Sequence, residues 1–263
     1  MSTVVDPIAV WAHLPTAFLP IVVIPVYNHG EAIGAMLAGV RKHDLPCLLV
    51  DDGSDADCAG VLDALVAAWP EQVSLLRLPS NQGKGQAVMA GFREAGRRGF
   101  SHALQIDADG QHNPADIPGF LDESRAHPDA VICGCPVFDA SVPKVRLYGR
   151  YATHVWVWIN TLSFDIRDSM CGYRVYPLAP TLALMDASRL GRRMDFDGDI
   201  LVRLYWRGVE VRNRETRVTY PLDGISHFRL WRDNLRISRM HATLFFGMLV
   251  RLPMLVLRKW RRA

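Results

Sequence analysis

The sequence predicts an α/β domain built on a mostly parallel sheet, followed by a basic amphipathic helical tail. Short apolar runs rich in β-branched residues alternate with helix-length amphipathic segments through the first half of the chain. The strand-like runs are continuously apolar, as expected for parallel strands that are covered on both faces. With 263 residues, of which 49% are hydrophobic, the chain can form one large domain with an appendage.

The first half predicts strands and helices in strict alternation. In chain order they are strand 21–24, helix 31–42, strand 47–50, helix 58–69, strand 73–78, helix 85–98, strand 103–106, helix 117–126 and strand 131–133. The second half is less regular, with an aromatic-rich segment at 148–162 and a polar loop at 168–174 that enters a strand. Beyond it we expect a helix at 196–206 and strands at 209–211 and 216–220. We assign residues 1–228 to the main domain and 229–263 to the tail.

Polar clusters follow three of the predicted strands, at Pro25–Asn28, Asp51–Ser54 and Asp107–Asp109. Because ligands of parallel sheets bind at the carboxyl ends of the strands, these clusters are expected to lie along one edge. Asp107 and Asp109 stand one residue apart and offer hard oxygen ligands that suit Mg²⁺ or Mn²⁺. A turn or a helix cap explains any one cluster, whereas three together indicate a ligand site.

The charge distribution and the cysteine content limit where the protein can be located and what it can bind. The net charge is +3, but the chain from Arg229 onward holds nine Lys or Arg residues and one acid, Asp233. Five cysteines without a C-x-x-C pair indicate a reducing compartment, and the first residues do not resemble a signal peptide. A basic tail predicts an anionic partner, but no nucleic-acid recognition motif accompanies it, so nucleic acid is not expected.

The tail combines basic residues with aromatic and apolar ones, such as Trp231 and Leu244. This composition is typical of a helix that lies in a membrane interface. Packing against the domain or in a dimer is the alternative, and a homo-oligomer remains open. No window reaches about 18 uncharged apolar residues, so no ordinary transmembrane helix is predicted. We therefore expect a cytoplasmic protein, peripheral on the cytoplasmic face of a membrane.

Four motifs in order resemble glycosyltransferase family 2, the inverting enzymes with the GT-A fold. The resemblance spans about residues 19–228. The four motifs are Val23–Asn28, Val50–Ser54, Asn81–Gly85 and Asp107–Gln111. Within the family, the chain is most similar to the branch around dolichyl-phosphate mannose synthase, which glycosylates polyprenyl phosphates. The Gly83–Gly85 turn, Gln111 and Gly172–Arg174 carry this narrower similarity.

The resemblance implies a donor site for a UDP or GDP sugar. It implies that the nucleotide-sugar is bound by Pro25, Tyr27, Asn28, Asp51, Asp52, Lys84, Asp107, Ala108 and Asp109. Asp107 and Asp109 would form the D-x-D motif that holds Mg²⁺ or Mn²⁺, with Gln111 as a further metal ligand. The metal would stabilise charge on the leaving nucleoside diphosphate. Arg174 would clamp a phosphate, as a planar guanidinium does well.

The acceptor side carries fewer motifs. Asp197 and Asp199 are the candidate general bases, and Asp199 is preferred because it aligns with an acid of the polyprenyl-phosphate branch. A phosphate acceptor is already anionic and would need no base. Ser226 and His227 belong to a recognisable Gly-x-Ser loop and are candidate contacts to the diphosphate or the acceptor.

Two positions depart from the family pattern. His29 stands where an acid commonly follows Tyr-Asn, which puts a base or helix-cap contact in doubt. Pro136 stands where polyprenyl-phosphate enzymes carry an Arg near the acceptor phosphate, and Arg146 or Arg150 are the candidate substitutes.

The expected function is metal-assisted, inverting transfer of a sugar from a nucleotide-diphospho-sugar to a lipid or polyprenyl-phosphate-type acceptor. One alternative is a sugar-phosphate nucleotidyltransferase, which would need a Gly-rich loop with Arg after the first strand; residues 25–30 do not supply it. The other is a membrane-docked module that binds a nucleotide-sugar without catalysis. The presence of Asp107, Asp109 and Arg174 argues against that module.

Overall fold

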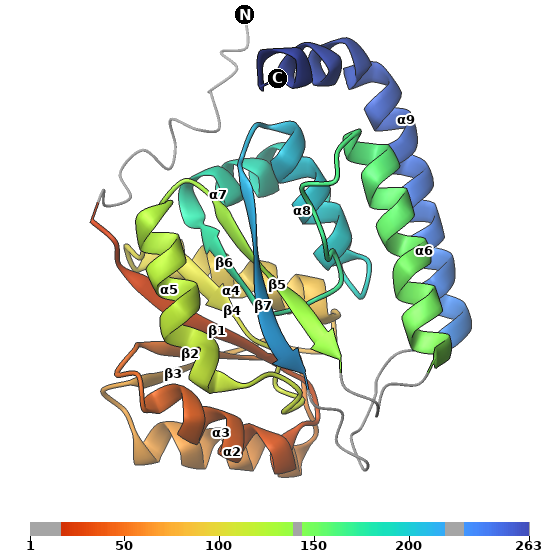
Figure 1. Cartoon of the computed structure of the whole chain (residues 1–263). Helices are drawn as coiled ribbons and strands as arrows, with labels where there is room; N and C mark the ends of the chain where they lie inside the picture. Colours follow the sequence, from red (N-terminus) through yellow and green to blue (C-terminus); the bar gives the residue numbers. More distant parts are fainter. Residues whose placement is uncertain (1–16, 139–143, 219–228, 263) are drawn as a thin grey trace, which may run out of the picture.

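The structure is a computed structural model that describes residues 17–138, 144–218 and 229–262 (Figure 1). Within these residues, seven strands form one sheet in the order β3-β2-β1-β4-β6-β5-β7. Their bounds are β1 Pro20–Val26, β2 Cys47–Asp51, β3 Val73–Arg77, β4 His102–Gln105, β5 Val131–Phe138, β6 Arg174–Pro177 and β7 Val211–Val218.

Helices cover both faces of the sheet (Figure 1). Their bounds are α2 Gly30–Arg41, α3 Ala56–Ala68, α4 Lys84–Arg97, the 3₁₀ turn η1 Pro114–Asp116, α5 Ile117–Ala126, α6 Lys144–Thr161, α7 Leu178–Ala187, α8 Phe196–Trp206 and α9 Leu230–Arg262. Strand β1 separates two hydrophobic clusters, because successive side chains of a strand point to opposite faces. Ile21 and Val23 join the cluster under α4, α7 and α8, whereas Val22 and Ile24 join the cluster under α2, α3 and α5.

Strand direction places the polar clusters. Strands β3, β2, β1 and β4 run parallel, so the segments that follow them emerge at one edge of the sheet. Strand β6 is antiparallel to β4 and β5, and the pairing of Gln105 with Arg174 brings the start of β6 to the end of β4. The 168–174 loop therefore meets the Asp107–Asp109 segment, although nearly sixty residues of chain separate them.

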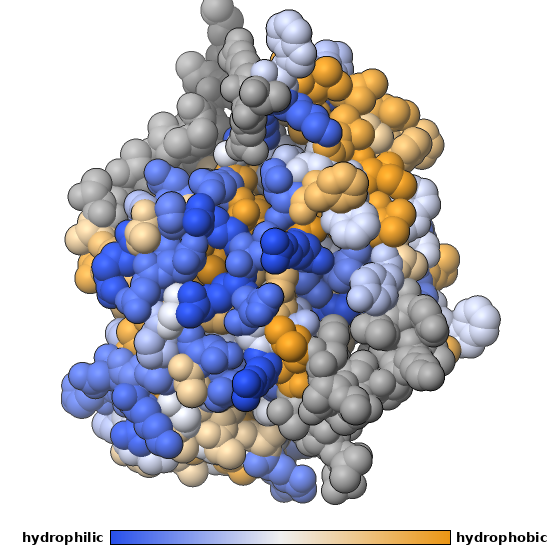
Figure 2. All heavy atoms as spheres, viewed as in Figure 1, coloured by the Kyte–Doolittle hydropathy of each residue, from blue (hydrophilic) through white to orange (hydrophobic). Residues whose placement is uncertain are grey.

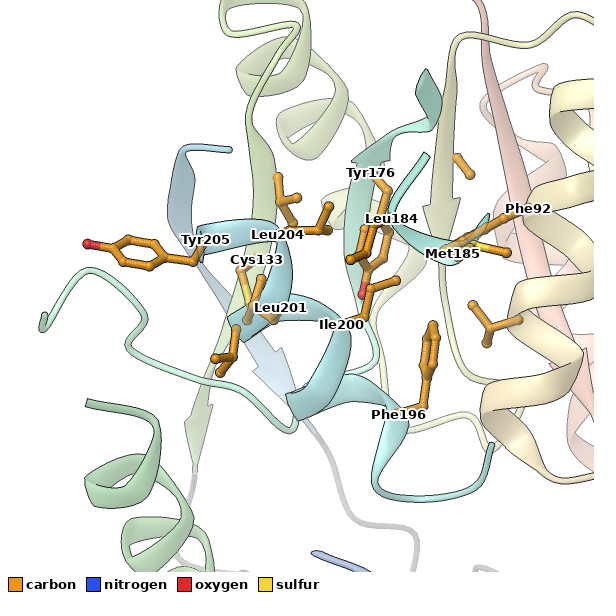
Figure 3. Close-up of a cluster of buried hydrophobic side chains, with 14 of the residues drawn as sticks. Phe92, Cys133, Tyr176, Leu184, Met185, Phe196, Ile200, Leu201, Leu204 and Tyr205 are labelled. Carbon is orange, nitrogen blue, oxygen red and sulfur yellow. The ribbon is translucent and has the colours of Figure 1, made fainter. Parts of the chain in front are cut away.

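Helix α8 lies on the other side of this edge of the sheet. Phe196, Ile200 and Leu204 are fully buried and pack toward the Tyr176 and Leu184 side of the core (Figure 3). This burial orients the first turn of α8, which begins at Phe196, toward the turn that begins α4. The predicted helix over 196–206 is confirmed at both ends.

The second half contains the main differences from expectation. The two strands expected at 209–211 and 216–220 are one strand, β7, which pairs with β5 along its whole length. The polar residues of its middle stay at the surface of an edge strand, so they do not interrupt it. Helix α7 was not predicted because most of its residues are buried, which leaves no amphipathic pattern to detect.

Helix α9 lies along α6 and against α8 (Figure 1). Met240, Leu244 and Met248 bury their side chains in the core cluster. Arg258 donates to the last carbonyls of α8, Tyr205 O at 2.6 Å and Trp206 O at 2.8 Å. By length and composition alone, α9 is long and apolar enough to cross a membrane, and 28% of its most apolar window is buried. This finding differs from the expectation that no segment of the chain could form a transmembrane helix. The boundary at residue 228 stays a prediction.

Candidate active site

The loop after β2 is braced by Asp51. One oxygen of this buried carboxylate accepts from Ser54 N at 2.9 Å, and the other accepts from Arg77 Nε at 2.7 Å. Gly53 adopts φ 69°, and a Cβ there would overlap the backbone of Ser80. Both oxygens of Asp51 thus face protein groups, and its observed role is to shape the loop.

Asp52 shapes the neighbouring turn that begins α4. Its two oxygens accept from Gln82 N at 2.7 Å and Gly83 N at 2.8 Å. Burial raises the pKa of Asp52, although these backbone hydrogen bonds and the charge of Arg193 act in the opposite direction. Gly83 adopts φ 103°, which only glycine tolerates easily. Asp52 therefore fixes the backbone immediately before Lys84.

The segment after β1 lies at the same edge of the sheet as the loops after β2 and before α4. Asn28 adopts a left-handed conformation, with φ 54°, which asparagine tolerates better than most residues. Its backbone N–H donates to Ser54 Oγ at 3.1 Å, and its side-chain oxygen accepts from Asp55 N at 2.9 Å. Pro25 pairs with Val50 in the sheet, and Tyr27 follows it half-buried. The structure therefore brings the first two polar clusters together.

Lys84 joins three elements of the site. Its Nζ lies 2.7 Å from Asp107 Oδ2, after β4, and 2.9 Å from Asp197 Oδ2, in the first turn of α8. Gln105 Nε2 donates to the other oxygen of Asp197 at 3.2 Å. Burial lowers the pKa of Lys84, but the two carboxylates outweigh it and hold the pKa above its usual range. Lys84 is therefore a charged ammonium between two acids.

Asp107 and Asp109 retain oxygen atoms for a ligand. Within the described residues, Asp107 Oδ1 is buried without a hydrogen-bond partner, while Asp109 Oδ1 accepts from Gln111 N at 3.0 Å. Burial and the neighbouring Asp107 raise the pKa of Asp109. Burial also acts to raise the pKa of Asp107, but Lys84 holds it below its usual value. Ala108, between the two acids, is buried in the core.

These donors fit a hard divalent cation. Two carboxylates close to each other, one with an unsatisfied buried oxygen, are the donors that Mg²⁺ or Mn²⁺ takes. Across the part of the chain that the structure describes, no three His, Cys, Asp or Glu side chains form a complete metal cage. A metal here would therefore draw its remaining ligands from substrate phosphate oxygens and water, as Mg²⁺ commonly does.

Two residues to which the sequence analysis gave no role, His112 and Gly172, also lie beside these acids. His112 is buried beside the two acids, and burial lowers its pKa even though Asp107 and Asp109 act to raise it. Gly172 lies against Asp107, since a Cβ at this position would overlap the carboxyl group. The Gly172 signal was visible in the sequence as part of Gly172–Arg174, but its reason, close approach to Asp107, was not.

The two candidate bases face different surroundings. Asp197 joins Lys84 and Gln105, so it belongs to the site. Asp199 instead accepts from Arg203 Nε at 2.5 Å and from Gly191 N at 2.9 Å. Burial raises the pKa of Asp199, while Arg203 acts to lower it. The structure thus brings Asp197, not the preferred Asp199, to the D-x-D segment.

The structure places Arg174 inside the protein rather than at the open edge of the sheet. Its side chain is completely buried, and its Nη1 donates to Tyr176 OH at 3.1 Å and to the backbone oxygen of Asp197 at 2.7 Å. Its Nε and Nη2 are buried without a hydrogen-bond partner among the described residues, and its expected role as a phosphate clamp stays a prediction. The pairing of Arg174 with Gln105 places it at the start of β6, and its contact with the Asp197 backbone shows that the side chain lies against the first turn of α8. Arg174 thus holds the first turn of α8.

The structure describes only some of the residues that were expected on the acceptor side. Ser226 and His227 lie outside the described residues, as does the side chain of Arg146. Pro136 is half-buried in β5. Arg150 binds Asp168 through two hydrogen bonds, at 2.5 and 2.8 Å.

Comparison with known proteins now identifies the fold. The sequence profile described as Glycosyl transferase family 2 matches residues 21–191. The chain belongs to this family. The matched range includes the three strand-end clusters, Lys84 and Arg174, and it ends before α8, so Asp197 lies outside it.

Two relatives support the narrower similarity. The chain is 33% identical over 162 residues to a polyprenol monophosphomannose synthase of Mycolicibacterium smegmatis, covering 59% of this chain and 60% of that protein. It is 31% identical over 169 residues to an undecaprenyl-phosphate mannosyltransferase of Micrococcus luteus, covering 62% of this chain and 68% of that protein. The match therefore spans about three fifths of the first relative's length.

Solved structures support the fold. The chain aligns with glucosyl-3-phosphoglycerate synthase from Mycobacterium tuberculosis, crystallised with Mn²⁺, uridine diphosphate and phosphoglyceric acid. The TM-score is 0.64 at 13% identity, covering 92% of this chain and 81% of that one. The expected GT-A fold is confirmed.

Proposed function

We propose that this protein is a metal-assisted glycosyltransferase that moves a sugar from a nucleotide-diphospho-sugar to a lipid-phosphate acceptor, with inversion. Family membership and the names of the two relatives support the reaction and the acceptor class. The observation that carries the proposal is the cluster of Lys84, Asp107, Asp109 and Asp197 at the carboxyl edge of the sheet. It combines a fixed cation with carboxylate oxygens that remain available to a ligand.

Each residue of the cluster would have a defined task in the donor site. Asp52 holds the Gln82–Gly83 backbone, so the turn that carries Lys84 is preorganised. Asp107 and Asp109 would hold the metal, which supplies Lewis-acid stabilisation of the leaving diphosphate. Lys84 would place a second positive charge beside the same oxygens. Pro25, Tyr27 and Asn28 would line the nucleotide.

The hydrogen bonding of the candidate bases favours an acceptor that is already anionic. Both oxygens of Asp197 accept hydrogen bonds, from Lys84 and Gln105, and both oxygens of Asp199 accept from Arg203 and Gly191. In this arrangement neither carboxylate offers an unengaged oxygen to take a proton from a hydroxyl. A phosphate acceptor needs no such base, which agrees with the polyprenol and undecaprenyl-phosphate relatives.

We also propose a peripheral position on the cytoplasmic face of a membrane, and the surface of α6 and α9 supports the membrane contact. Apolar residues are gathered over α9 in the space-filling view (Figure 2). The exposed large apolar residues of the two helices are Tyr151, Val155, Trp156, Ile159, Leu230, Trp231, Leu235, Phe246, Leu249, Val250, Leu252, Met254, Val256, Leu257 and Trp260. Together with the basic residues of α9, they suit a helix that lies in the interface.

The proposal is tested by donor binding and then by transfer. Thermal unfolding is followed with UDP, GDP and their sugars, with and without Mn²⁺, for wild type, Asp107→Asn and the surface control Asp122→Asn. We expect one nucleotide family to raise the melting temperature of wild type and Asp122→Asn in a metal-dependent way. The matching sugar should then label polyprenyl phosphate. If no nucleotide stabilises wild type, the donor site is wrongly assigned.

A further inference from the structure

A polar cavity lies on the side of the first turn of α8 away from Lys84. It has a volume of about 340 Å³ and lies between the α7–α8 loop, α8 and the first half of α9. Its ionisable lining consists of Arg189, Arg203, Arg236, Arg239, Asp195 and Asp199. Asp199 thus faces this cavity, whereas Asp197, two residues earlier, faces the donor site.

The lining has an excess of positive charge that the protein does not neutralise. Arg203 binds Asp199 through Nε at 2.5 Å, and Arg236 binds Asp233 through Nη1 at 2.7 Å. For Arg189 and Arg239, the described residues supply no ion pair. Three acids face these four arginines, namely Asp195 and Asp199 in the lining and Asp233 beside Arg236, so one net positive charge remains. Arg189 is presented from the loop that precedes α8 and Arg239 from α9.

The existing pairs also leave donors for a ligand. Arg203 donates its Nε–H to the carboxylate of Asp199. Within the described residues, no hydrogen bond is seen from the terminal amino groups of Arg203. Arginine side chains that are held by one carboxylate and still present terminal N–H groups bind phosphate oxygens with a defined geometry. Thr243, at the edge of the cavity, donates its hydroxyl to Arg239 O at 2.9 Å and lies one turn along α9.

An apolar strip continues from the cavity along α9. Phe246 lies two helical turns after Arg239 and Val250 three turns after it, so the three residues share one side of the helix. Phe246 and Val250 are 67% and 81% exposed. A ligand with an anionic head in the cavity would therefore extend its apolar part over these side chains.

We propose that this cavity binds the phosphomonoester headgroup of a membrane lipid. The arginines of the cavity would contact the phosphate, and the Phe246–Val250 strip would contact the acyl region. The site is separate from the donor site, and its occupancy does not require sugar transfer. It would fix the rotation of α9 on the membrane, because the headgroup must enter from the side of Arg239.

The test is vesicle flotation with full-length protein. Vesicles of phosphatidylcholine contain phosphatidic acid or, at matched surface charge, phosphatidylserine. The pocket variant is Arg189→Gln/Arg239→Gln, and the control is Arg192→Gln/Arg232→Gln. The control changes exposed arginines of the same loop and the same helix that do not line the cavity. Melting temperatures verify that each variant is folded.

We expect wild type to prefer phosphatidic acid, and the pocket variant to lose about tenfold more affinity for it than the control, as for loss of charge-assisted phosphate contacts. Excess inorganic phosphate at matched ionic strength should compete. Equal losses in the two variants would show a non-specific charge effect. That result, no preference for phosphatidic acid, or binding of inorganic phosphate without binding of vesicles would overturn the proposal.

Discussion

Lys84 and Asp197 form an ion pair at 2.9 Å between the first residue of α4 and the first turn of α8, across 113 positions of sequence. The same ammonium binds Asp107 at 2.7 Å. One side chain therefore connects the D-x-D segment to the helix that the family profile does not reach. The three side chains are largely buried, so the removal of the cation would leave two acids close together in a poorly solvated place.

Replacing Lys84 is expected to be severe. Lys84→Met removes the cation and should lower kcat/KM by about 10²- to 10³-fold, the scale of losing one preorganised electrostatic group. Steady-state transfer rates check this, with Lys42→Met, at the end of α2, as the control. A Lys84→Met enzyme with the wild-type rate would show that the ammonium serves only the fold.

Gly172→Ala is expected to disturb Asp107 directly. The added methyl group would overlap the carboxylate, so the side chain must move away from the metal position. We expect metal-dependent stabilisation by the nucleotide to be lost while the circular dichroism spectrum is retained. Gly60→Ala is the matched control, because nothing lies within 4 Å of its Cβ and it lies in helix α3. Unchanged metal dependence in Gly172→Ala would contradict the observed contact.

Asp197→Asn and Asp199→Asn should separate the two acids. Asp197→Asn weakens the hold on Lys84 and is expected to raise the donor KM. Asp199→Asn weakens the pair with Arg203 and should lower the free energy of unfolding by about 1–3 kcal/mol, typical of a hydrogen bond to a charged group, with a small effect on transfer. Denaturant titrations and kinetics of both variants check this. The opposite pattern would return the base role to Asp199.

Asp168 is expected to stabilise the fold in a way that depends on pH. Burial acts to raise its pKa, but His154 and Arg150 outweigh it and hold the pKa well below its usual range. A carboxylate with a depressed folded-state pKa stabilises the fold above its unfolded pKa, about 4, and this stability disappears as the pH falls toward the folded value. The unfolding free energies of wild type and Asp168→Asn should therefore differ by about 3–5 kcal/mol at neutral pH, and this difference should shrink steadily as the pH falls below about 4. A constant difference would argue against this linkage.

The sequence predicted the parallel half of the fold because its strands are short apolar runs between amphipathic helices. It also predicted that Asp52 and Asp107 lie along one edge, since strand-end clusters share an edge, and the family resemblance placed Lys84 in the same site. It preferred Asp199 to Asp197 and did not foresee that Asp197 faces Lys84, because this depends on how α8 rotates against Tyr176 and Leu184 in the core. The burial of Arg174 depends on the antiparallel insertion of β6, which no local pattern encodes.

The most direct test of the central claim is transfer of a radiolabelled sugar from its UDP or GDP donor to polyprenyl phosphate. Wild type is compared with Asp107→Asn and Asp122→Asn, each with Mn²⁺ and with a chelator. The proposed function predicts lipid-linked product from wild type and Asp122→Asn only with the metal, and none from Asp107→Asn. Equal product from Asp107→Asn, or product that persists in the chelator, would contradict it.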